Sequence, residues 1–186
     1  MNPEIVIRRE RPDQADVTAA LGELDRYLAS LYPPQANHIL GVQALLAPDV
    51  RFLVARAGDG GLLGTGAYRA MPGEPDTASR GYGEIKRMFV VPARRGQRIG
   101  ACILQALETD MVTQGLDLAL LETGEYQTEA VHLYKRAGYV RRGPFGGYPD
   151  NGLSLFFAKT LTPSSHSLAV PPRGRSVPSG AGADLP

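Results

Sequence analysis

The chain has 186 residues, of which 43% are hydrophobic, so it is long enough to bury the core of one domain. Its 20 Lys and Arg nearly balance its 19 Asp and Glu, which argues against a dedicated binder of nucleic acid or of a membrane surface. The single Cys102 excludes an intramolecular disulfide and a cysteine-based zinc site, and no apolar run reaches the ~18 residues of a membrane helix. We therefore expect a soluble cytoplasmic domain that binds no metal.

In the first half of the chain, the hydrophobic pattern predicts one long helix and a β-hairpin. Val17, Leu21 and Leu24 recur at helical spacing, and the Pro33–Pro34 pair ends the pattern. A Gly-Asp-Gly-Gly turn then separates two strands. The expected elements are a strand over 4–8, helices over 13–32 and 39–46, strands over 51–57 and 62–70, and a loop over 71–80.

The second half alternates strands and helices. Gly115 and Gly138 each follow a helical pattern, where a glycine commonly ends a helix. The expected elements are a strand over 83–91, a helix over 96–114, a strand over 118–122, a helix over 128–137 and strands over 139–142 and 153–159. The strand–helix–strand order over 83–122 predicts two parallel strands with a right-handed crossover. The fold class is therefore α/β, with a mixed central sheet flanked by helices.

The composition changes near the end of the chain. Residues 162–186 contain 5 Pro, 5 Ser and 3 Gly. Such a segment cannot bury enough apolar area to offset the entropy lost when it is ordered. We expect one folded domain over 1–161 and a disordered tail over 162–186.

The stretch over 84–100 is the most informative part of the sequence. A strand runs into a short glycine-containing loop that opens a helix, and five basic residues with no acid lie between Lys86 and Arg98. Unpaired amides and the positive end of the helix dipole make such a junction suitable for a polyanion such as pyrophosphate. The loop matches neither the P-loop pattern nor the dinucleotide-binding fingerprint.

At this junction the sequence resembles the GNAT superfamily of acetyl-CoA-dependent N-acetyltransferases. The run from Arg95 to Ala101 (RGQRIGA) is similar to the family signature Arg/Gln-x-x-Gly-x-Gly/Ala, with Arg98 in place of the middle glycine. The run from Gln127 to Tyr139 is similar to a second family motif, with Gln127 in place of Asn. The resemblance covers roughly residues 4–160 and extends to a bacterial branch, some members of which have an indole-3-acetate acetyltransferase label.

The resemblance implies acetyl-CoA as co-substrate and a small-molecule amine as acceptor. In this family the strand equivalent to 84–91 has a bulge and splays from the strand equivalent to 118–122, so that the pantetheine arm fits the gap like an added strand. The amide of Met88 is then expected to point at the thioester oxygen, and the loop amides are expected to bind the pyrophosphate. The implied cofactor-binding residues are Met88, Phe89, Val90, Arg95, Gly96, Gln97, Arg98, Ile99, Gly100, Ala101 and Gln127.

The same resemblance implies two catalytic residues. Glu84 lies where many family members have a general base, which is useful because an amine must lose its proton before it can attack. Its distance along the strand from Met88 suggests a relay through water. Tyr134 corresponds to the tyrosine that protonates the departing thiolate.

Each of these interpretations has a structural alternative. Glu84 is equally well explained by an ion pair with Lys86 or Arg87, and Tyr134 by packing against the sheet. The Arg94, Arg95 and Arg98 cluster would then be a solvated face. Cys102 is expected to fill the core, and His38 to be a loop residue or part of the acceptor wall. Tyr126 and Tyr148 are left undecided as residues of the acceptor mouth.

Two rival functions remain open at this point. One is a non-catalytic protein that binds or senses acyl-CoA, for which the Arg98 and Gln127 departures leave room. The other is an N-acetyltransferase that acts on proteins, which would need an open acidic groove. The family also makes a homodimer an expectation.

Overall fold

The computed structural model describes residues 4–34, 37–150 and 152–162. The predicted tail beyond residue 162 therefore lies outside the described residues. The elements in chain order are β1 (Ile5–Arg9), α1 (Ala15–Leu31), α2 (Val42–Leu45), β2 (Val50–Ala57), β3 (Leu62–Met71), β4 (Tyr82–Val90), α3 (Ile99–Thr113), β5 (Leu118–Gly124), α4 (Thr128–Arg136), β6 (Val140–Arg142) and β7 (Ser154–Thr160), with short 3₁₀ turns η2 (Pro75–Thr77) and η3 (Pro92–Arg94).

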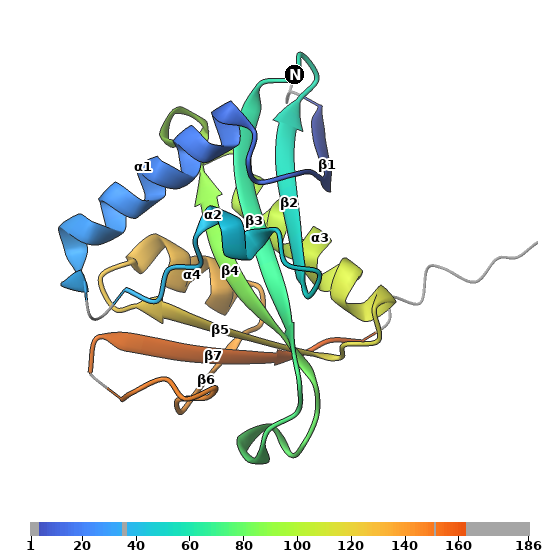
Figure 1. Ribbon diagram of the computed structural model, residues 1–186, viewed down its shortest axis with the longest axis vertical. Coiled ribbons are helices and arrows are strands. Elements are labelled where there is room, and N and C mark those ends of the chain that lie inside the picture. Colours follow the sequence, from blue (N-terminus) through green and yellow to red (C-terminus); the bar gives the residue numbers. More distant parts are fainter. Residues whose placement is uncertain (1–3, 35–36, 151, 163–186) are drawn as a thin grey trace, which may run out of the picture.

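One seven-stranded sheet organises these elements, in the order β1-β2-β3-β4-β5-β7-β6. The strands β2, β3 and β4 form an antiparallel meander, β1 pairs antiparallel with β2, and β4 and β5 form the parallel pair that the sequence predicts. The late strands β5, β7 and β6 pair antiparallel. The predicted α/β fold with a mixed sheet is confirmed (Figure 1).

Helices cover both faces of the sheet, and each face has its own apolar cluster. On one face α1 and α2 pack Val17, Leu21 and Leu45 against Phe52 of β2. On the other face, a larger cluster joins α3 and α4 to the sheet and includes buried Leu107. In Figure 1, α1 and α2 lie in front of the meander and α3 lies behind it. Burial of these faces supplies the main free energy that stabilises the fold.

The meander and the late strands separate at the centre of the sheet. The pairing of β4 with β5 stops after Ile85 and Leu121, although β4 continues to Val90 and β5 to Gly124. In Figure 1 these two strands diverge strongly beyond their paired ends. The gap between them positions the site described below, as the family resemblance implies.

Two helices are shorter than the sequence predicts. The helix expected over 96–114 begins at Ile99, because Gly96 and Arg98 adopt left-handed φ values of 79° and 62° that an α-helix cannot contain. The helix expected over 39–46 covers only Val42–Leu45, because the chain is still extended at Gly41. Within the described ranges, no helix is both long and apolar enough to span a membrane.

Candidate active site

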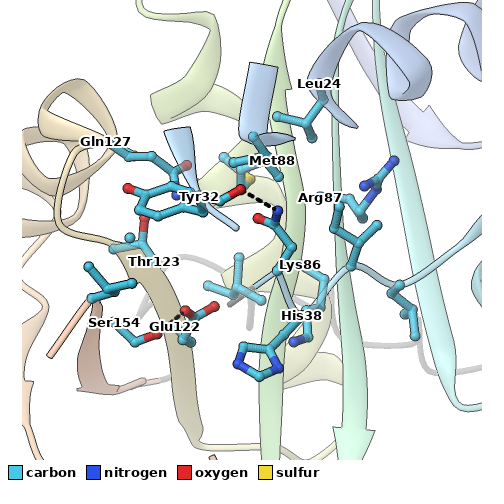
Figure 2. Close-up of a pocket in the computed structure, with 18 of the residues that line it drawn as sticks. Leu24, Tyr32, His38, Lys86, Arg87, Met88, Glu122, Thr123, Gln127 and Ser154 are labelled. Atoms are coloured by element: carbon cyan, nitrogen blue, oxygen red, sulfur yellow. Dashed lines mark hydrogen bonds between the residues drawn. The ribbon is translucent and has the colours of Figure 1, made fainter. Parts of the chain in front are cut away.

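A cavity of about 110 Å³ lies where β4 and β5 separate. Its walls come from the end of α1, the extended segment 37–40, both splayed strands, the start of α4 and the start of β7. Figure 2 shows Met88, Lys86, Glu122 and Tyr32 arranged around it. The segment 37–40, part of which the sequence predicts as helix, is not helical and contributes to this wall.

A bulge in β4 shapes one side of the cavity. Thr65 of β3 pairs with Phe89 and Ala67 pairs with Lys86, so two residues of β4, Arg87 and Met88, stand opposite the single residue between them. Arg87 has a φ of 57°, and the Thr65 hydroxyl donates to its carbonyl oxygen at 3.1 Å. The bulge therefore turns the end of β4 away from β5.

The bulge also decides which backbone groups face the gap. The amide of Val91 donates to Leu63 of β3, and backbone groups alternate in direction along a strand. Phe89 therefore presents its amide and carbonyl to β3, whereas Met88 and Val90 present theirs to the gap. Of the three residues that the sequence nominates for the pantetheine arm, Met88 and Val90 direct backbone groups to the gap, although the Val90 carbonyl oxygen accepts a hydrogen bond from Arg95 Nε at 3.3 Å.

The side chain of Arg87 crosses to the first helix. It is only 4% exposed, and its guanidinium forms an ion pair with Asp25 of α1 and donates to the Leu21 carbonyl oxygen at 3.3 Å. The sequence analysis considered Arg87 as an ion-pair partner of Glu84, whereas in the structure Arg87 forms its ion pair with Asp25 of α1.

The loop before α3 has the amides that an anion site needs. Within the described ranges, the amides of residues 96–101 donate to no backbone carbonyl, whereas the amide of Arg95 donates to the Pro92 carbonyl oxygen at 3.2 Å. A Cβ added to Gly96 would meet open space, so its left-handed φ is what favours glycine here. The side chains of Arg95 and Arg98 are exposed beside these amides. The arrangement fits a pyrophosphate, because free amides at a helix start bind phosphates.

Glu84 is buried in a small polar cluster. Only 6% of its surface is exposed, and its Oε1 lies 2.8 Å from Lys86 Nζ and accepts a hydrogen bond from the Tyr148 hydroxyl at 2.5 Å. Lys86 also donates to the Tyr148 hydroxyl. Burial, together with the Glu84 carboxylate, raises the pKa of Tyr148. The ion pair with Lys86 that the sequence offered as the alternative for Glu84 is therefore present, and Lys86, unlike Glu84, lines the cavity.

Tyr134 both packs and faces the cavity. It is 5% exposed, and its ring lies edge-on to Tyr139 with centroids 5.8 Å apart. It is also one of the cavity-lining residues. Burial, with a smaller contribution from the Glu122 carboxylate, raises the pKa of its hydroxyl, which therefore stays protonated at neutral pH. Its position suits a proton donor at this site.

The sequence did not nominate Glu122 and Ser154 as site residues. Glu122 is half-buried near the end of β5, and the Ser154 hydroxyl donates to its Oε1 at 2.7 Å (Figure 2). A signal was present: Glu122 directly follows the apolar run Leu118–Leu121, at the carboxyl end of a predicted parallel strand, where sheets commonly bind ligands. His38 also lines the cavity, its Nε2 is buried, and its ring lies edge-on to that of Tyr148, with centroids 4.8 Å apart.

Tyr32, at the end of α1, also lines the cavity. Its hydroxyl accepts from the Tyr126 amide at 2.9 Å, and the two rings stack at 5.7 Å. Gly124 allows this, since an added Cβ would lie 2.1 Å from the Tyr32 hydroxyl oxygen. Gln127, at the start of α4, also lines the cavity. Cys102, on α3, is half-buried and does not line it.

The described part of the chain contains no group of three or more His, Cys, Asp or Glu side chains that could bind a metal ion. The ionisable side chains that line the cavity are one carboxylate (Glu122), one lysine, one arginine, one histidine and two tyrosines. This set is suited to binding an organic substrate and moving protons.

Comparison with known proteins agrees with this arrangement. Residues 19–139 match the acetyltransferase (GNAT) family. An IAA acetyltransferase of Azospirillum brasilense is 47% identical over 159 residues, which cover 86% of this chain and 99% of that protein. The uncharacterized N-acetyltransferase YsnE of Bacillus subtilis is 29% identical over 147 residues, which cover 78% of this chain and 92% of that protein.

Solved structures agree on the fold. A Klebsiella pneumoniae protein assigned to the acyl-CoA N-acyltransferases is 31% identical with a TM-score of 0.69, covering 85% of this chain and 98% of that one. The PaiA N-acetyltransferase of Thermoplasma acidophilum, in complex with coenzyme A, is 18% identical with a TM-score of 0.64, covering 84% and 99%. The splayed strands, the free amides before α3 and these matches lead to one conclusion: the chain belongs to the GNAT family of acetyltransferases and is an acyltransferase.

Proposed function

We propose that the protein transfers the acetyl group of acetyl-CoA to the amine of a small molecule by direct attack in a ternary complex. The observation that carries this proposal is the cavity at the splay of β4 and β5, next to backbone groups that no neighbouring strand uses. A cavity of about 110 Å³ has room for an acetyl group and the amine end of an acceptor.

The acetyl-CoA would bind along the gap and the loop. Met88 and Val90 would pair with the pantetheine arm as a strand does, and the Met88 amide would stabilise the oxygen of the thioester as negative charge develops there. The amides of residues 96–101 would bind the pyrophosphate, with the Arg95 and Arg98 side chains beside it. Gln127 would contact the cofactor from the start of α4.

Two further residues have roles in the chemistry that we propose. Tyr134 would give a proton to the departing thiolate, since its hydroxyl is protonated and faces the cavity. Glu84 would act indirectly, because Lys86 and Tyr148 lie against its carboxylate. In that role it holds Lys86 and Tyr148 in place beside the acceptor, and so it is a positioning residue.

A thiol-release assay with acetyl-CoA and a panel of amines tests this function. We expect release of coenzyme A that depends on the amine, and an acetylated amine as the second product. Indole-3-acetate (IAA), which has no amine, is tested beside the panel as a non-basic compound, because the relative from Azospirillum brasilense is named for it. Binding of coenzyme A by calorimetry without thiol release would favour the non-catalytic alternative. Release only with basic peptides would favour a protein acetyltransferase.

The loop can be tested separately. Replacing Arg95 and Arg98 together by Ala should raise the KM for acetyl-CoA, and more so at low salt, because exposed charges are screened by ions. Arg9→Ala is the matched control, since Arg9 is an exposed arginine on β1. An unchanged KM would mean that these side chains do not bind the phosphates. A cytoplasmic location and a homodimer stay predictions of the family resemblance.

A further inference from the structure

Two carboxylates, those of Glu84 and Glu122, lie near the point where β4 and β5 separate, and they differ in their hydrogen-bond and ion-pair partners. Glu84 forms an ion pair with Lys86, accepts a hydrogen bond from the Tyr148 hydroxyl and is 6% exposed. An acceptor amine could reach its oxygens only by displacing these partners. Glu84 is therefore poorly placed to receive a proton directly from a substrate.

Glu122 is differently placed. Lys86 and Glu122 directly follow Ile85 and Leu121, the last paired residues of β4 and β5, so they lie on opposite sides of the gap, and both line the cavity. One oxygen of Glu122 accepts from Ser154, and among the described residues no basic side chain forms an ion pair with Glu122. The carboxylate lines the cavity, so a bound molecule would meet it directly (Figure 2).

The charges around the cavity leave one negative charge without a counter-charge. Lys86 is paired with Glu84, and Arg87 is paired with Asp25. Glu122 is the remaining ionisable carboxylate of the cavity wall in the described part of the chain. A half-buried carboxylate of this kind attracts a cation, since the low local dielectric strengthens the attraction.

We propose that Glu122 binds the acceptor as an alkylammonium ion and takes its first proton, which deepens the proposed function and rests on it. The acceptor class is then a small aliphatic primary amine. Such amines are almost wholly protonated at neutral pH, since their pKa is near that of a lysine side chain, about 10.4. An acceptor without a basic nitrogen would gain nothing from Glu122.

The proposed transfer releases one net proton. The ammonium gives one proton to the Glu122 carboxylate, which later releases it to solvent. The neutral nitrogen attacks the acetyl carbonyl carbon, the new N–C bond forms, and the C–S bond breaks. The nitrogen loses a second proton, and this balances the proton that Tyr134 gives to the thiolate sulfur. The net products are the acetamide, the thiol of coenzyme A and one proton.

The pH profile of Glu122→Gln tests this proposal on one alkylamine that the wild-type protein acetylates. Glutamine keeps the size of the side chain and can still accept from Ser154. Wild-type kcat/KM should be nearly flat from about pH 6.5 to about pH 9, because the enzyme uses the abundant ammonium form. The variant must use the free amine, so its kcat/KM should fall at least 100-fold at pH 7 and rise about tenfold per pH unit.

Controls separate this role from a structural one. Glu122→Asp retains a carboxylate, so its profile should stay flat even where its rate is lower. Glu125→Gln, three residues along and outside the cavity lining, should match the wild type. The other titratable and charged groups around the cavity all remain in every variant. They are Tyr32, His38, Lys86, Arg87 and Tyr134 of the lining, and Glu84 and Tyr148, which contact Lys86. The ratio of the wild-type pH profile of kcat/KM to that of Glu122→Gln therefore reports the contribution of Glu122.

The outcomes are distinguishable. A steeper profile for the glutamine variant alone, with unchanged calorimetric affinity for coenzyme A, supports the proposal. Parallel profiles for wild type and Glu122→Gln would overturn it while leaving the acetyltransferase function in place. Wild-type protein that acetylates no amine at any pH would refute the proposed function itself, and the inference with it.

Discussion

Gly124→Ala should destabilise the protein through a single side chain, Tyr32. The new methyl group would lie 2.1 Å from the Tyr32 hydroxyl oxygen and 2.2 Å from its Cζ, far inside contact distance. Overpacking of this kind costs about 1–3 kcal/mol, and loss of the 2.9 Å hydrogen bond from the Tyr126 amide adds about 0.5–1.5 kcal/mol. The free energy of unfolding should therefore fall by about 2–4 kcal/mol, which lowers the Tm by roughly 4–16 °C in a domain of this size.

Urea unfolding followed by circular dichroism measures this loss. Gly143→Ala is the control, since an added Cβ there meets nothing within 4 Å, and its cost should be within about 0.5 kcal/mol. In a Tyr32→Ala background the clash disappears, so Gly124→Ala should then cost less than about 1 kcal/mol. An equal cost in both backgrounds would refute the assignment of the effect to Tyr32.

Three further outcomes are expected. Tyr134→Phe should lower kcat about 10- to 100-fold at unchanged acetyl-CoA KM, whereas a wild-type rate in the thiol-release assay would assign Tyr134 to packing. Hydrogen bonds from Arg56 lower the pKa of Glu10 from 4.5 to about 2, so the ionised carboxylate stabilises the fold above pH 4.5. This stabilisation is lost as the pH falls towards 2. Glu10→Gln should remove that part of the pH dependence of the free energy of unfolding, about 1–2 kcal/mol after solvent screening, when unfolding is measured between about pH 2 and about pH 7. The same loss of stability below pH 4.5 in the variant and in the wild type would contradict this. Asp25→Ala leaves the buried Arg87 guanidinium without its carboxylate and should cost about 1–3 kcal/mol in urea unfolding, and a loss below about 0.5 kcal/mol would show that solvent replaces Asp25.

Much of the fold follows from local pattern in the sequence. The hairpin turn between β2 and β3, the apolar row of α3 and the alternation of strand and helix after β4 each depend on neighbouring residues, and each appears as expected. The first residue of α3 could not be predicted from the sequence, because Gly96 and Arg98 adopt left-handed conformations that the spacing of the apolar residues does not indicate. The extended segment before Gly41 was missed because its apolar residues suit a helix as well as a cavity wall.

Only part of the site could be predicted from the sequence, and the reason is physical. All of the proposed cofactor-binding residues except Gln127 lie on one continuous segment, over 84–101, so they could be named from a motif. The acceptor side joins residues far apart in the chain, such as Tyr32, Glu122 and Ser154, and their contacts depend on how three elements pack. The partner of Arg87 was likewise hidden, since Asp25 is 62 residues away in sequence.

The salt bridge from the β4 bulge to α1 has a mechanical consequence. Arg87 sits at the residue where β4 bends, one position before Met88, and its guanidinium is fastened to Asp25 and Leu21 on the helix that borders the acceptor side. Displacement of α1 by a bound acceptor would therefore also displace the β4 bulge, next to Met88, which we propose to contact the thioester. If acetyl-CoA and the acceptor bind as proposed, the binding of either one should change the position of α1.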